Sequence, residues 1–291
     1  MAINDDIIRK LEGIRNLPTL PAIIQKLRNC LLNPNSDAGQ VAKIIEDDPA
    51  MMLKILKVVN SAFFGSSEPI TSIRHAVARM GFTSVSNVAL STSVFAAYGR
   101  KGEAGFNREE FWRHSISTGI AAEVLYDRCR QNIKSRYNKD VLHLSGLLHD
   151  IGKIIFEQYF HEQFLNAVKD CKERNIPLFL MEIEHISADH AQIGAWLGKK
   201  WGLSTELQEV IRWHHEPDNA NAKYIDLVML CHTANYICNL EKIGDSGDST
   251  APAFFHSVWK RLGLEIKDVP TITEQIREES QKSELLLALF E

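Results

Sequence analysis

The sequence of 291 residues lacks the features that mark membrane, secreted and disulfide-stabilised proteins. It has no run of 18 or more apolar residues, so we expect no membrane-spanning helix. Its N-terminal segment is charged and lacks the apolar core of a signal peptide. Only five cysteines occur, far apart and without a CxxC pair, which argues against a disulfide framework and a cysteine zinc site. These absences predict a cytoplasmic protein.

The sequence also lacks an excess of charge of either sign. Lysine and arginine number 33 against 37 aspartates and glutamates, which gives a formal net charge of −4. This balance argues against a nucleic-acid-binding surface that extends over the whole chain. The hydrophobic share of 45% and the charged share of 24% are those of an ordinary globular protein, which excludes disordered and collagen-like classes.

No segment shows the alternating pattern of a β-strand, and almost every periodic stretch has helical spacing, so we predict an all-α, multi-helix bundle. The expected helices are 5–15, 22–32, 37–48, 50–64, 70–80, 84–98, 111–130, 141–160, 162–174, 185–201, 205–214, 224–240, 253–262 and 273–289. For residues 241–250 we predict a flexible acidic loop.

A polar break at 99–105, GRKGEAG, is the expected internal boundary. It divides the chain into an N-terminal helical subdomain at 1–105 and a second helical subdomain at 106–240, followed by a C-terminal loop and helices at 241–291. Because the break is short, we expect the two halves to pack together rather than move freely.

Histidine is the one residue type that is present in excess, with 11 copies. The predicted site consists of residues that fall within or at the end of expected helices: His114, His149, Asp150, His190, His214 and His215. Imidazole nitrogen together with a carboxylate oxygen suits Fe, Mn, Zn or Ni, and ligands from several helices can converge in a bundle. We therefore expect a divalent transition metal, as one ion or two.

The pair His149-Asp150 lies in the apolar stretch SGLLHDIGKIIF at 145–156. Charged side chains in such a buried helix are costly unless they are paired or bind metal. Lys153 follows His149 by four residues and faces the same side, where its cation could bind a phosphate oxygen.

A single helical histidine is more often a core residue than a metal ligand, and it is the two adjacent pairs that favour a site. His232, three residues before Asn235, stays open between the two interpretations. Glu182 and Glu184 precede His190; either could orient a ligating histidine, although a surface role is the simpler expectation. The other histidines fit an incidental role: His75, His143, His161, His185 and His256.

These motifs resemble the HD superfamily of metal-dependent phosphohydrolases, and within it the HDOD (HD-related output domain) family. The HD part of the resemblance rests on His114-Ser115, LLHDIGK at 147–153, DHAQIGAWL at 189–197 and WHHEP at 213–217. The HDOD part rests on LPTLP at 17–21 and on the segments 47–65 and 70–90. The resemblance implies an all-helical bundle with an HD-like core and an additional helical N-terminal region.

The resemblance also implies roles for individual residues. His114 corresponds to the first histidine ligand, and His149 with Asp150 to the HD pair, whose aspartate can bridge two metals. His190, His214 and His215 correspond to the additional ligands of the two-metal branch, and Lys153 to the lysine that binds the substrate phosphate. We therefore expect Asp150 and Lys153 to be catalytic residues.

The sequence departs from the HD pattern at two places. A late helix of that pattern carries an aspartate in a sequence like LAD, whereas this chain has LCHTANYIC with Asn235 in that place. An amide is a weak, neutral ligand where a carboxylate is expected. The GYP-type segment of the branch that cleaves cyclic dinucleotides is also missing after His215, where the chain reads EPDNANAKY.

Two functions therefore remain open from the sequence. The first is a metal-dependent phosphohydrolase or phosphodiesterase that acts on a phosphate-containing small molecule or nucleotide. The second is a regulatory module that binds a signalling partner and in which the metal site is structural or sensory. Nucleic-acid binding through the helices at 37–65 is weaker, because Lys54, Lys57 and Arg74 are balanced by acidic residues 46–48 and solvated helix faces explain them.

Overall fold

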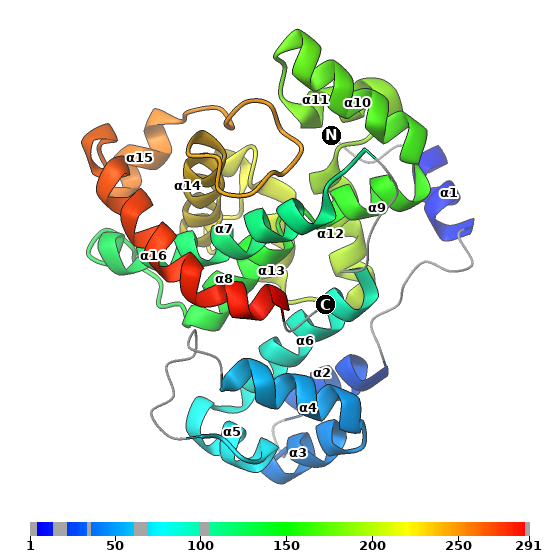
Figure 1. Ribbon diagram of the computed structural model, residues 1–291, viewed down its shortest axis with the longest axis vertical. Helices are drawn as coiled ribbons and strands as arrows, with labels where there is room; N and C mark the ends of the chain where they lie inside the picture. The colour runs from blue at the N-terminus through cyan, green and yellow to red at the C-terminus, as the bar shows by residue number, and fades with distance from the viewer. Residues whose placement is uncertain (1–4, 14–21, 34–35, 61–68, 99–104, 289–291) are drawn as a thin grey trace. The chain divides into compact units, whose positions relative to one another are not determined.

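The computed structural model describes residues 5–13, 22–33, 36–60, 69–98 and 105–288. Within these ranges the regular elements are all helices, which confirms the prediction of an all-α protein (Figure 1). None of the described helices is long and apolar enough to span a bilayer. The predicted break at 99–105 lies outside the described residues except for Gly105.

The chain forms two compact units, and the smaller one comprises Pro18–Arg100 and Gln281–Glu291. Its helices are α2 (Ala22–Leu32), α3 (Ala38–Glu46), α4 (Pro49–Val59), α5 (Ile73–Met80) and α6 (Phe82–Tyr98). Helix α6 packs against α2, α4 and α5. The Asp48 carboxylate accepts a hydrogen bond from Met51 N at 3.0 Å and so caps the start of α4. Residues 61–64 of the predicted helix 50–64 lie outside the described residues.

The larger unit comprises Met1–Leu17 and Lys101–Ser280 and contains every predicted site residue. Its helices are α1 (Asp5–Gly13), α7 (Arg108–Cys129), α8 (Lys139–Leu148), α9 (Ile151–Tyr159), α10 (His161–Arg174), α11 (Leu178–Ile186), α12 (His190–Trp201), α13 (Thr205–Trp213), α14 (Ile225–Leu240), α15 (His256–Leu262) and the part of α16 (Val269–Ala288) up to Ser280, with short 3-10 turns η2 (Pro217–Asn219) and η3 (Ile266–Asp268). Helix α7 packs against both α8 and α14, and the three form its centre.

An apolar cluster joins α7 and α14 to the helices that follow them. Leu125, Leu230 and Ile272 are fully buried there. Cys231 and Cys238 are buried free thiols that belong to the same cluster, in keeping with a packing role. Burying such side chains stabilises the fold by about 1.5–3 kcal/mol each, so this cluster provides a rigid base for the ends of α8 and α13.

The structure corrects two predicted helices. The range 141–160 is not one helix, because the chain bends between α8 and α9 at His149 and Asp150. The range 185–201 is also divided: α11 ends at Ile186, Ser187 adopts a left-handed conformation with φ of 70°, and Asp189 caps the start of α12. Most of α11 was not predicted as helix at all. Both breaks lie beside predicted metal ligands.

Candidate metal centre

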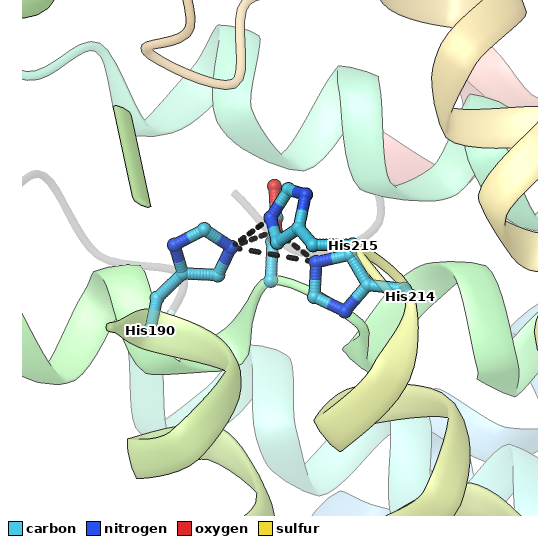
Figure 2. A group of neighbouring side chains, drawn as sticks. His190, His214 and His215 are labelled. Atoms are coloured by element: carbon cyan, nitrogen blue, oxygen red, sulfur yellow. Dashed lines mark hydrogen bonds and ion pairs between the residues drawn. The ribbon is translucent and has the colours of Figure 1, made fainter. Parts of the chain in front are cut away.

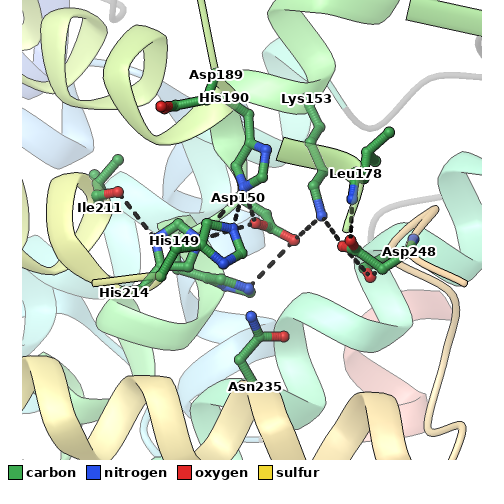
Figure 3. A network of polar contacts seen from close by, with 12 residues as sticks. His149, Asp150, Lys153, Leu178, Asp189, His190, Ile211, His214, Asn235 and Asp248 are labelled. Atoms are coloured by element: carbon green, nitrogen blue, oxygen red, sulfur yellow. Dashed lines mark hydrogen bonds and ion pairs between the residues drawn. The ribbon is translucent and has the colours of Figure 1, made fainter. Parts of the chain in front are cut away.

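Asp150 lies at the centre of the predicted site, with three imidazole rings around its carboxylate (Figure 3). Its Oδ1 atom lies 3.0 Å from His190 Nε2 and 3.4 Å from His214 Nε2. Its Oδ2 atom lies 3.3 Å from His149 Nε2. All four side chains are completely buried, so this is an interior polar cluster rather than a solvated surface group.

Helix ends bring these residues together. His149 and Asp150 lie between the last residue of α8 and the first of α9. His190 is the first residue of α12, and His214 follows the last residue of α13. Gly152 allows the close approach of α9 to α12, because a Cβ atom there would overlap the backbone carbonyl of His190. The helix breaks that the sequence did not predict are therefore what positions the site.

Backbone carbonyls fix the orientation of two of the rings. His149 Nδ1 lies 2.6 Å from the Gly146 carbonyl oxygen, and His214 Nδ1 lies 2.9 Å from that of Ile211. Because a carbonyl can only accept, each Nδ1 carries the proton and donates. Each Nε2 atom then has its lone pair toward Asp150, which is the arrangement of a metal-ligating histidine.

His190, His214 and His215 form a second close group (Figure 2). His215 Nε2 lies 2.8 Å from His190 Nε2, and His190 Nε2 lies 3.4 Å from His214 Nε2. The His215 ring stacks on Phe179 of α11, with ring centroids 4.7 Å apart. Three imidazole nitrogens directed at one another repel unless a proton or a cation lies between them.

Glu182 of α11 holds His190 from the side opposite Asp150. One carboxylate oxygen lies 2.6 Å from His190 Nδ1 and accepts a bond from His190 N at 2.8 Å. Burial alone would lower the pKa of His190, but the carboxylates of Glu182 and Asp150 raise it to about 10. Glu184 is exposed and pairs with Arg174 at 2.9 Å. Of the two carboxylates considered from the sequence, Glu182 is therefore the one that faces the site.

Lys153 is completely buried and contacts two carboxylates. Its Nζ atom lies 2.7 Å from Asp150 Oδ2 and 2.8 Å from Asp248 Oδ2. Burial alone would lower the pKa of this ammonium group, but the two carboxylates raise it above its usual value. Both close partners of the cation are thus protein groups.

Asp248 is a site residue that sequence reasoning missed. It lies in the segment 241–250 that was predicted as a flexible loop, yet its side chain is only 7% exposed. Its Oδ1 atom accepts a bond from Leu178 N at the start of α11, at 3.1 Å. A buried lysine predicts a carboxylate partner, but nothing in the sequence indicates which acidic residue supplies it.

His114 and Asn235 face each other across α7 and α14. His114 Nε2 lies 3.0 Å from Asn235 Oδ1, and the His114 ring lies 5.6 Å from that of His149. The residue in place of the expected aspartate therefore contacts the predicted first ligand. His232, left open above, lies beside the site: its Nδ1 atom donates to the His214 carbonyl oxygen at 2.7 Å.

The donor groups fit a divalent transition metal. Potential ligand atoms of Asp150, His190, His214 and His215 lie within 4.8 Å of one another, as do those of His114, His149 and Asp150. Burial lowers the pKa of His214 to about 3 and that of His114 to about 4, so both are neutral, the form that binds metal. Among the described residues, buried His149 Nε2 has no hydrogen-bond partner.

Comparison with known proteins identifies the family to which the chain belongs. The family model of the HDOD domain matches residues 17–217. The chain belongs to the HDOD family. A solved HDOD domain protein with unknown function, from Geobacter sulfurreducens, is 21% identical, with a TM-score of 0.75 over 97% of this chain and 94% of that one. The HDOD fold of the present chain is thus that of solved relatives.

Two further relatives extend this comparison of the HDOD chain. A Shewanella amazonensis SB2B protein, whose name proposes a metal-dependent phosphohydrolase, is 22% identical, with a TM-score of 0.64 over 99% of this chain and 97% of that one. An uncharacterized protein of Treponema pallidum (strain Nichols) is 27% identical over 227 residues, which is 77% of this chain. The present chain spans 42% of the length of that curated relative.

A cavity of about 630 Å³ adjoins the metal-ligand group of this HDOD chain on the side of His215. Helix α11 contributes an apolar wall through Phe179, Leu180 and Ile183. The charged lining residues are Arg212 of α13 and the carboxylates of Asp189 and Glu216. This volume is in the range of small-molecule sites. His215 is the member of the group that reaches from the buried cluster into this cavity.

Proposed function

We propose that this HDOD chain is a signalling or regulatory protein with a metal-dependent phosphohydrolase or phosphodiesterase activity toward a nucleotide-like phosphate ester. The observation that carries the proposal is the position of Asp150, which belongs to both groups of potential ligands. A divalent ion bound there supplies polarisation of a phosphoryl oxygen and activation of a water nucleophile. His114, His149, His190, His214 and His215 are the other proposed ligands.

The chain's own side chains prepare this site in defined ways. Lys153 holds Asp150 Oδ2 at 2.7 Å and so fixes the carboxylate that both groups share. Glu182 fixes the ring of His190 through Nδ1. Asp150 and Lys153 are therefore the residues that we propose as catalytic. The positive charge of Lys153 would stabilise negative charge on the phosphate, and its contact with Asp150 would hold that carboxylate in position.

The cavity beside His215 supports an ester with an organic group of small-molecule size. Its apolar wall on α11 suits an aromatic or nucleobase-like group. The name of the Shewanella amazonensis protein agrees with this reaction class, although at 22% identity the likeness concerns the fold.

The test is hydrolysis by the full chain loaded separately with Mn²⁺, Fe²⁺, Zn²⁺ or Ni²⁺. Substrates are a phosphomonoester, a phosphodiester, nucleotides and cyclic dinucleotides, each compared with a His149→Ala control. We expect turnover of at least one substrate by the wild-type chain that is lost in the control. Equal rates in both proteins for every substrate would refute the proposed activity.

The second candidate is a non-catalytic output module in which the metal is structural or sensory. It is favoured by Asn235 in the place of the expected aspartate and by the complete pairing of Lys153 with protein carboxylates. In that case, replacing ligands lowers the melting temperature while no substrate is turned over. Loss of turnover at unchanged stability supports the enzyme instead.

A further inference from the structure

The amide of Asn235 has only one orientation that satisfies its neighbours. Asn239 Nδ2 lies 3.0 Å from the backbone oxygen of Asn235 and 2.5 Å from Asn235 Oδ1. The backbone oxygen can only accept, so the Asn239 atom that faces it must be the NH₂ group. The Asn235 atom next to that NH₂ group must then be an acceptor, which fixes it as the amide oxygen.

This orientation determines which nitrogen of His114 carries the proton. Asn235 Oδ1 is an acceptor and lies 3.0 Å from His114 Nε2, so the imidazole must donate through Nε2. His149 and His214 are the reverse case, because their Nδ1 atoms donate to backbone carbonyls and their Nε2 lone pairs face Asp150. His114 is thus held in the opposite tautomer, with its lone pair on the buried Nδ1 atom, which has no hydrogen-bond partner among the described residues.

The charges on the His114 side also disfavour a second ion. His114, His149 and Asn235 bring no carboxylate to this side, and Asp150 is shared with the other group. Lys153 places a buried cation 2.7 Å from that shared carboxylate. A second dication would therefore repel both the first ion and Lys153 in a buried site without a carboxylate of its own.

We propose that this metal centre binds one divalent ion tightly, at Asp150, His190, His214 and His215, and that Asn235 disfavours a second ion by placing a neutral amide where a carboxylate would bind metal and by keeping His114 Nε2 protonated. The inference rests on the proposed metal centre but does not depend on its hydrolytic activity. An aspartate at position 235 would add an anionic oxygen on this side and accept a metal ion.

The experiment counts Mn²⁺ ions on the full-length protein by elemental analysis after equilibrium dialysis at micromolar free Mn²⁺. Electron paramagnetic resonance reads whether the ions are isolated or exchange-coupled. We expect one ion per wild-type chain with the signal of isolated Mn²⁺. In Asn235→Asp we expect two ions per chain and the signal of a coupled pair.

A matched control is Asn175→Asp, the same chemical change at an exposed helix C-cap, which should retain the wild-type count. His114→Ala provides a second reading if Asn235→Asp folds poorly: it should keep the single ion, whereas His190→Ala should lose it. Two ions on the wild-type chain, one ion on folded Asn235→Asp, or loss of the ion in folded His114→Ala would each overturn the inference. A wild-type chain without any ion would instead refute the metal centre itself.

Discussion

At the scale of single residues, the site depends on how buried charges are paired. Asp150, Lys153 and Asp248 form a row in which one buried ammonium group lies between two carboxylates, at 2.7 and 2.8 Å. A buried charge that loses its partner costs several kcal/mol, whereas the net contribution of an intact pair is small. The ion pair between Asp248 and Lys153 therefore connects the segment 241–250 to the site, although no residue of that segment is a proposed metal ligand.

Replacing Asp248 by Asn should test this row directly. The amide keeps the shape of the side chain but leaves Lys153 with one carboxylate, so we expect a loss of about 3 kcal/mol in the free energy of unfolding at pH 7. Urea unfolding monitored by circular dichroism measures it. Asp245→Asn, an exposed change in the same loop, should alter stability by no more than about 0.5 kcal/mol.

The same comparison has a defined pH dependence. Burial alone would raise the pKa of Asp248, but the Lys153 ammonium holds it below its usual value. A carboxyl group with a lowered pKa in the folded state stabilises fully above its unfolded pKa of about 3.9, and this contribution disappears as pH falls through the folded value. The difference between wild type and Asp248→Asn should be constant from pH 7 to 5 and shrink below about pH 4. A difference that grows on acidification contradicts the ion pair.

His190 should release a proton when metal binds. Burial alone lowers its pKa, yet the neighbouring carboxylates raise it to about 10, so the ring is protonated at pH 7.5 and must lose the Nε2 proton to become a ligand. We expect release of about one proton per bound ion, measured by calorimetry in buffers of different ionisation enthalpy.

The variant Glu182→Gln should release markedly less, because an amide does not stabilise the imidazolium. Glu184→Gln is the matched control on the same helix, since its carboxylate is exposed and pairs with Arg174. It should behave as the wild type does. Equal proton release from all three proteins would show that Glu182 does not set the charge of His190.

At the scale of elements, helical periodicity predicted most helices but not the breaks that build the site. The apolar stretch at 145–156 continues through His149-Asp150, so its pattern alone indicates one helix. The bend there follows from tertiary packing on α12, which periodicity does not record. Ser187, which follows the last residue of α11, adopts a left-handed conformation that serine seldom favours. The sequence therefore carries no sign that a helix ends there.

The candidate ligands were predictable for a different reason. Each lies in a short motif whose residue types carry the chemistry, and the structure brings all six into two adjacent groups around Asp150. Glu182 was considered but not singled out, and Asp248 was not considered, because their roles depend on contacts across 8 and 95 residues. Such contacts leave no local pattern in the sequence.

The packing of α9 on α12 gives a prediction at this scale. A methyl group at Gly152 would overlap the carbonyl oxygen of His190, which is backbone and cannot rotate away. We expect Gly152→Ala to cost about 3 kcal/mol in urea unfolding and to weaken metal binding, because α12 carries His190. In Gly198→Ala on α12 the nearest atom to the added methyl group is the flexible end of Leu203, at 3.3 Å, and all its close neighbours are side-chain atoms, so the effect should be much smaller. Equal stability of the two variants would contradict the close approach.

At the scale of the whole molecule, the proposed metal centre lies entirely within the larger unit. Its ligands come from α7 to α13, and Asn235 and Asp248 follow from the same unit. The five tryptophans of the sequence, at 112, 196, 201, 213 and 259, also fall within Lys101–Ser280. Tryptophan fluorescence therefore reports the unit that contains the site, whereas far-ultraviolet circular dichroism reports helices of both units.

Metal binding should consequently stabilise the two units differently. A ligand at 100 times its dissociation constant adds about 2.7 kcal/mol to the state that binds it, and only the larger unit has the site. We expect chelation with EDTA to lower the melting temperature that fluorescence reports. The circular dichroism transition should then divide in two, and the step that belongs to the smaller unit should keep its melting temperature. His190→Ala should melt like the chelated protein and respond no further to EDTA. A fluorescence transition that ignores metal would refute the centre, and equal shifts of every helical signal would show that the two units unfold as one.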